Sequence, residues 1–171
     1  MTNSSYIGSI VRLWALGSGA VLLAIMAVTS LNTLAFAASR MAEPLGLQIG
    51  GLPGYEDFVS LSIAVAALGF LPWCQWRRGH IAIDFLMARL PARVGQIADS
   101  LWLALLAATA LFLAYWLGIG MLEAKADSAL SPVLGWPRWP FFAPGILSML
   151  LWAVVCLTQL VGRPSSEGMV Q

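Results

Sequence analysis

The sequence has few charged residues for its length. Only 10% of the 171 residues are charged, whereas 60% are hydrophobic, and the mean hydropathy is +0.83. Soluble domains carry about 25% charged residues, so a water-facing surface could not be covered in the usual way. The net charge of +1 gives no sign of a nucleic-acid partner. The composition excludes an ordinary soluble domain and predicts a single membrane domain over residues 1–171.

Metal ligands and nucleophiles are also scarce. His80 is the only histidine, and Cys74 and Cys156 lie in apolar runs without a Cys–His metal spacing. Asp84 shares a helix face with His80, but a metal would need a further ligand, for which Asp99 is the one candidate. No G-x-S-x-G, H-E-x-x-H or P-loop pattern occurs. The sequence therefore predicts no metal, no cofactor and no enzyme activity.

Long uncharged runs predict an all-α integral membrane protein with four transmembrane helices. A helix needs about 20 apolar residues to cross the roughly 30 Å hydrocarbon core. The first run would form a helix of about 39 Å, so we expect it to tilt or protrude. Pro72 should kink or shift the last turn of the second span, and the Gly-rich stretch before that span leaves its start open. The predicted spans are 13–38, 58–76, 97–122 and 141–161.

The distribution of cations predicts the orientation in the membrane. With an even number of spans, both termini lie on one side. That side carries six arginines: Arg12, Arg77, Arg78, Arg89, Arg93 and Arg163. The other side carries three cations: Arg40, Lys125 and Arg138. By the positive-inside rule, both termini and residues 77–93 are expected in the cytoplasm.

The segment RRGHIAIDFLMARLP begins at Arg77 and separates the second span from the third. It predicts a short amphipathic cytoplasmic connector helix at about 77–93. One apolar stripe follows the i, i+3, i+4, i+7 pattern, and a second stripe partly opposes it, which suggests lipid on one side and protein on the other. His80 and Asp84 are expected to fix its local geometry or to contact a partner subunit. Four arginines are expected to contact phospholipid headgroups: Arg77, Arg78, Arg89 and Arg93.

This segment and the four-span layout resemble the small, DctQ-type membrane subunit of tripartite ATP-independent periplasmic (TRAP) transporters. Members of that family carry a motif resembling R-x-G-H-I-x-V-D-x-L after the second span, followed by Leu-Pro and a basic residue. Glu56 resembles an acidic residue that is usual near the start of the second span. The matching motif residues here are Arg77, Gly79, His80, Ile81, Ile83 in the Val place, Asp84, Leu86, Leu90, Pro91 and Arg93.

The resemblance implies a non-catalytic scaffold subunit in the bacterial inner membrane. Its partners would be a large TRAP membrane subunit, which carries the solute and sodium sites, and a periplasmic solute-binding protein. Together they would import an organic acid, driven by a sodium gradient. The residues support a passive role independently, because no charged side chain lies in the middle of a predicted span, where ion pathways place them. Glu56, Asp57 and Asp99 all lie near span ends, as possible helix-end or partner contacts.

Other functions remain open at this stage. The chain could anchor another complex, such as a redox complex, although a transmembrane bis-histidine haem needs two histidines. An autonomous small exporter would need a membrane-embedded acidic residue, which the middle sections of the predicted spans lack. A generic assembly protein is a further alternative. Only the motif at 77–93 and the topology argue against it. The charged residues 123–127 and Arg138 could lie near a docked binding protein or form a solvated loop.

Overall fold

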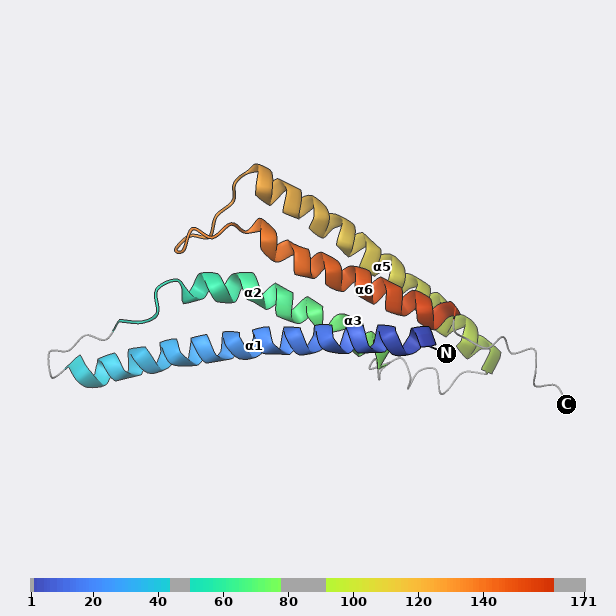
Figure 1. The fold of residues 1–171 in the computed structure, drawn as a ribbon, viewed down its shortest axis with the longest axis horizontal. Helices are drawn as coiled ribbons and strands as arrows, with labels where there is room; N and C mark the ends of the chain where they lie inside the picture. The colour runs from blue at the N-terminus through green and yellow to red at the C-terminus, as the bar shows by residue number, and fades with distance from the viewer. Residues whose placement is uncertain (1, 44–49, 78–91, 162–171) are drawn as a thin grey trace.

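The structure is a computed structural model that describes residues 2–43, 50–77 and 92–161 (Figure 1). Four helices in these ranges are long and apolar enough to cross a membrane. The only β pairing described in them is an isolated bridge between Leu130 and Pro137. The predicted all-α membrane fold with four transmembrane helices is confirmed. The predicted connector helix lies outside the described residues, except at its two edges.

The two outer helices are longer than the uncharged runs that predicted them. Helix α1 has 41 residues and α5 has 35, or about 62 and 53 Å. Even at a tilt of about 40°, both exceed the roughly 30 Å hydrocarbon core, so their ends reach into or beyond the interface. The elements are α1 (Thr2–Ala42), α2 (Tyr55–Gly69), α3 (Leu71–Trp76), α5 (Ala92–Ala126), η2 (Trp139–Phe141, a 3-10 helix) and α6 (Phe142–Val161).

A proline divides the second span into two helices. Pro72 lies in the first turn of α3, where its missing N–H is tolerated. Gly69 ends α2 against helix α1, and a Cβ at this position would collide with the hydroxyl of Ser18. The expected effect of the proline is therefore present as a break at Phe70, between α2 and α3.

Helix α1 packs on α2 and α3 along one narrow stripe. Four of its buried residues, Val11, Ser18, Ile25 and Asn32, recur every seven positions, and Ala15 adds to the same face. A seven-residue repeat is the spacing at which two helices stay in contact at a shallow crossing angle. The rest of the α1 surface is therefore available to lipid or to another chain.

The hydrophobic core lies between α5 and α6. Small side chains on α5, such as Ala107, Ala110 and Ala114, allow close approach of the two backbones. Met149 and Trp152 of α6 fill the space opposite them. Because α6 also contacts α2 and α3, it is the central helix of the molecule.

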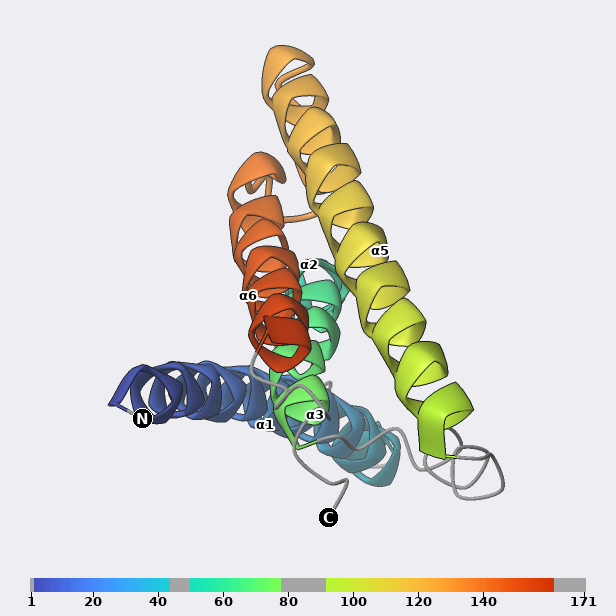
Figure 2. The same cartoon turned by 90° about the vertical axis from the view of Figure 1, so that its right-hand side faces the viewer.

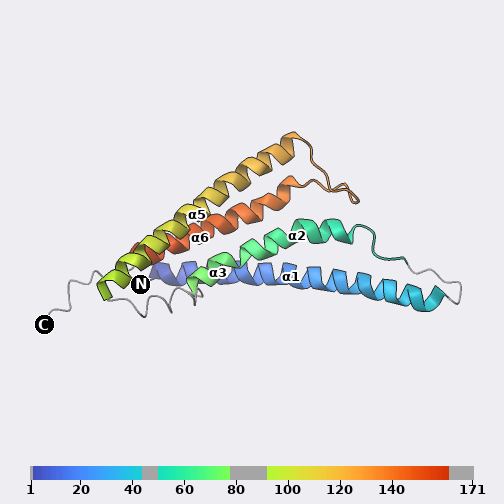
Figure 3. The ribbon, with the colours of Figure 1, turned by 180° about the vertical axis from the view of Figure 1, so that it is seen from behind.

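The four spans form a fan rather than a closed bundle. Helices α1 and α5 are outermost, with α2, α3 and α6 between them (Figure 2). All spans converge where α1 begins and α6 ends, and they diverge toward the other side (Figures 1 and 3). We call the converging side the terminal end. We call the other side, which carries the start of α2 and the α5–α6 connection, the loop end.

Candidate interaction surfaces

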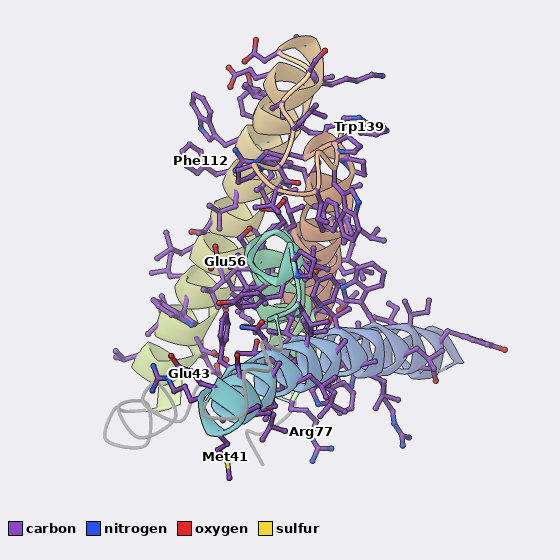
Figure 4. All side chains as sticks on the ribbon, turned by 90° about the vertical axis from the view of Figure 1, so that its left-hand side faces the viewer. Met41, Glu43, Glu56, Arg77, Phe112 and Trp139 are labelled. Carbon is purple, nitrogen blue, oxygen red and sulfur yellow. The ribbon has the colours of Figure 1, made fainter. Side chains whose placement is uncertain are left out.

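The two described members of the predicted headgroup contacts, Arg77 and Arg93, lie at the terminal end of the fan. Arg77 directly follows α3 and is exposed, with its guanidinium carbon 5.8 Å from the centroid of the Trp73 ring. Its label in Figure 4 lies at the edge of the molecule, away from the core. Arg93 belongs to the first turn of α5, and only its backbone is described. Four further predicted contacts lie outside the described residues: Arg78, His80, Asp84 and Arg89.

Two glutamines join α3 to α6 just before the predicted connector. The Gln75 amide donates to Gln159 Oε1 at 2.9 Å, and the Gln159 amide donates to the Gln75 backbone carbonyl at 3.0 Å. The Trp152 indole N–H points at Gln75 Oε1 at 3.5 Å, a long contact. Gln159 thereby gives a side-chain donor to a carbonyl in the last turn of α3. This pair fixes the direction in which the chain leaves α3.

A tryptophan and a serine join α1 to α6. The Trp14 indole N–H donates to Ser148 Oγ at 2.8 Å, and the Ser148 hydroxyl donates to the Pro144 carbonyl at 2.8 Å. Ser148 is fully buried. In a membrane each such bond satisfies a polar group that water cannot reach. The joint therefore ties the first span directly to the central helix.

At the loop end, Asn32 of α1 holds the segment that leads into α2. Its Oδ1 accepts the backbone N–H of Leu52 at 2.9 Å. A Cβ on the neighbouring Gly51 would lie 2.8 Å from this oxygen and 2.8 Å from the Phe36 ring, so glycine is required for the close approach. Asn32 thereby joins the last third of α1 to the segment that precedes α2.

Asp57 forms the joint between α2 and the α5–α6 connection. It lies in the first turn of α2 and is 2% exposed. Its Oδ2 accepts the backbone N–H of Val133 at 2.9 Å and that of Leu134 at 2.6 Å. Gly54, with φ at 78°, lets the chain turn into α2 beneath the Leu134 side chain, which any Cβ at this position would strike. The carboxylate is thus used inside the chain and is closed to an outside partner.

Glu56 and Asp99 stay candidates for helix-end or partner contacts. Glu56 lies beside Asp57 in the first turn of α2 but is exposed, and Figure 4 shows it at the near end of α2. Asp99 lies two turns into α5 and is half-buried, with an interaction inside the molecule. The structure separates these two residues, because they occupy opposite ends of the fan.

Both outer helices carry long apolar faces without an internal partner. Only 11% of the most apolar window of α1 and 17% of that of α5 is buried, against 39% for α6. On α1, Leu16, Leu23 and Leu34 lie on one face and are 61–67% exposed. The corresponding residues on α5 are Leu101, Leu105, Phe112 and Trp116, which are 54–67% exposed. These faces are where lipid or a membrane partner must contact the chain.

The described residues hold no arrangement for metal chemistry or proton transfer. No group of three His, Cys, Asp or Glu side chains gathers within them. Neither are there any Asp, Glu, Lys, Arg or His residues at 13–39, 58–76, 100–122 or 139–161. What these spans offer chemically is a set of neutral helix joints and apolar surfaces.

The chain matches a family of transporter subunits. The family model for the DctQ component of tripartite ATP-independent periplasmic transporters matches residues 48–164. The chain belongs to the DctQ family. It is therefore a multi-pass membrane component of a tripartite transporter, as its motif at 77–93 and its four spans suggested. Comparisons with curated proteins and with solved structures give no significant match.

Sequence reasoning missed several of the residues that join the DctQ chain internally. Asp57 was read as a helix-end or partner contact, without its bonds to the α5–α6 connection, and Gln75 was not considered at all. A glutamine at the end of an apolar span is itself a signal, because its amide needs partners in hydrocarbon. The partner, however, is 84 residues away and depends on the tertiary fold.

Proposed function

We propose that this chain is the non-catalytic scaffold subunit of its transporter. It pairs with a large membrane subunit that binds the solute and sodium. A periplasmic binding protein delivers an organic acid, and the sodium gradient drives its import. The proposal extends the family membership to this chain's own role, partners and energy source.

The observation that carries the proposal is the contrast between the surface and the interior of the spans. In the most apolar parts of the two outer helices, more than four fifths of the residues are not buried inside the chain. The described spans meanwhile lack charged side chains in their middle sections. A subunit that moved an ion itself would need such groups. Broad apolar faces and a passive interior are the properties that a static membrane support requires.

The orientation and the connector form part of the same proposal. Six arginines on the terminal side favour an inner-membrane protein with both termini in the cytoplasm. Arg77, Arg78, Arg89 and Arg93 then hold the connector at the headgroups of the inner leaflet. His80 and Asp84 fix its geometry or contact the large subunit. The exposed position of Arg77 beside Trp73 supports this assignment.

The experiment that tests the pairing is a pull-down from native membranes. The chain carries a C-terminal affinity tag and is solubilised in mild detergent. We expect one large, many-spanning membrane protein to co-purify in stoichiometric amount. Recovery of the chain alone, or with a redox protein, contradicts the proposal and favours a generic anchor. Loss of sodium-dependent organic-acid uptake on deletion of the chain then tests its place in transport.

Matched variants identify the docking face. The double substitution Leu16→Asn and Leu23→Asn makes the exposed apolar face of α1 polar. The double substitution Leu105→Asn and Phe112→Asn does the same on α5. We expect one pair to release the large subunit and the other to retain it, because a polar amide inside a dry helix interface loses its partners. Retention by both pairs, with normal membrane insertion, rules out these two faces as the contact.

A further inference from the structure

A cavity at the loop end combines an apolar lining with a single cation. It lies between α2, α5 and α6 and has a volume of about 150 Å³. Arg138 is the one charged residue among those that line it. The cavity is open on one side, and Ser60 is its second polar lining residue, but the rest of the surface is apolar enough for a hydrocarbon chain to pack against. The apolar lining comes mainly from Leu61, Val65, Leu68, Leu117 and Phe142.

A second cation lies near Trp139, the residue that follows Arg138 in the chain. The Lys125 ammonium is 5.3 Å from the centroid of the Trp139 ring. Figure 4 shows Trp139 beside the start of α6, at the loop end. Tryptophan is enriched at the level of the headgroups, where its ring meets the hydrocarbon and its N–H meets water. The two cations therefore lie at the depth where phospholipid phosphates are found.

Carboxylates also lie at this end of the molecule, and the exposed Glu56 is four residues before the lining residue Ser60. Glu123 and Asp127 are each two residues from Lys125, and side chains two apart on a helix do not face each other. The Asp57 carboxylate is buried and already accepts two backbone N–H groups. Arg138 is therefore the charged group that the cavity itself presents, beside a mainly apolar lining.

We propose that this cavity binds an anionic phospholipid. The phosphodiester group contacts Arg138 and Lys125, and part of one acyl chain fills the apolar space. Arginine binds phosphate oxygens in a bidentate manner, and lysine adds a point charge. The site is separate from Arg77 and the start of α5, which lie at the terminal end. The lipid proposal requires only that the chain spans a membrane. Its test is therefore independent of the proposed pairing with a large subunit.

Native mass spectrometry of the full-length chain in mild detergent tests the site. The chain is titrated with phosphatidylglycerol, with phosphatidylcholine of the same acyl chains, and with inorganic phosphate. We expect phosphatidylglycerol to bind more tightly than phosphatidylcholine, and inorganic phosphate not to bind, because it lacks the acyl chain. Arg138→Gln and Lys125→Gln should each reduce the preference for phosphatidylglycerol by about fivefold.

The chain offers matched controls for both parts of the ligand. Arg40→Gln removes an exposed cation at the same end of the molecule, away from the cavity lining, and should leave the preference unchanged. Ala64→Phe places a ring in the cavity and should weaken both phospholipids, because Ala64 lines it. Ala67→Phe adds the same ring at an exposed position outside the lining and should have little effect.

Three results overturn the proposal. One is equal binding of the two phospholipids by the unchanged chain. Another is a preference that survives both cation substitutions. The third is a preference that persists at about 1 M salt, where the screening length falls to roughly 3 Å; this measurement needs no variant to fold. If Arg138→Gln and Lys125→Gln leave lipid binding intact but abolish docking of the periplasmic binding protein, the surface belongs to that protein.

Discussion

The Asp57 carboxylate accepts the backbone N–H of Leu134 at 2.6 Å, across 77 residues of chain. The bond joins the start of the second span to the connection between the third and fourth spans. It is a charge-assisted bond to the main chain, which is stronger than a neutral one. Through this bond, the buried Asp57 side chain holds the start of α2 against the α5–α6 connection at the loop end of the molecule.

We predict that Asp57→Ala loosens the loop end and destabilises the chain. The variant leaves the N–H groups of Val133 and Leu134 without their acceptor, at a cost of about 1–3 kcal/mol in the free energy of unfolding. SDS titration in micelles, followed by circular dichroism, measures the change. Glu56→Gln alters the exposed neighbouring carboxylate and should leave the midpoint unchanged. An equal effect of the two substitutions would show that the buried bonds contribute nothing.

The glutamine pair predicts a double-mutant cycle. Gln159→Leu removes the acceptor of the Gln75 amide N–H, and Gln75→Leu removes the donor to Gln159 Oε1, so each should lower stability by about 1 kcal/mol. The double variant should cost less than the sum, since both partners become apolar. Thr158→Val is the control, because the Thr158 hydroxyl bonds only to the Val155 carbonyl of its own helix. Additive costs would mean that the two amides do not interact.

We also predict that Ser148→Ala weakens the attachment of α1 to the central helix. The Trp14 indole N–H would lose its acceptor while staying partly buried, at a cost of about 1 kcal/mol. Trp14→Phe in the same background should add little, since the indole bond is already absent. Hydrogen exchange of the α1 backbone reports the loosening. Unchanged protection in Ser148→Ala would show that apolar packing alone holds α1.

A steric prediction concerns the crossing of α1 and α2. Gly69→Ala should separate the two helices, because the new Cβ would occupy the position of the Ser18 hydroxyl. Ser18→Gly should restore the packing in the double variant, since it removes both colliding atoms. The distance between spin labels on α1 and α2, measured by electron paramagnetic resonance, should increase only in the single variant. An increased distance in the double variant would contradict the steric explanation.

Local signals were enough to predict the class of fold and the number of spans. Uncharged runs of sufficient length define transmembrane helices by themselves, and Pro72 marked where the second span breaks. The contacts of Asp57 and Gln75 could not be read in the same way. Their partners lie more than 70 residues away, and the choice of partner depends on which helices become neighbours.

Helices α1 and α5 extend beyond the predicted spans for a related reason. The sequence reasoning ended the first and third spans where polar and charged residues begin, although helix α5 continues through Glu123 and Lys125. A charged residue ends a transmembrane stretch but not a helix, because its side chain can reach water from the interface. Helix propensity, rather than hydropathy, therefore decides where these helices stop.

The uncharged middle of the four spans has an electrical consequence. Work done by the membrane potential is proportional to the charge that moves through it, about 2.3 kcal/mol per elementary charge per 100 mV. At 13–39, 58–76, 100–122 and 139–161 this chain carries no such charge. A rocking or sliding movement of these spans would transfer almost no charge across the bilayer. Voltage dependence of the assembled transporter should therefore originate in its other chains.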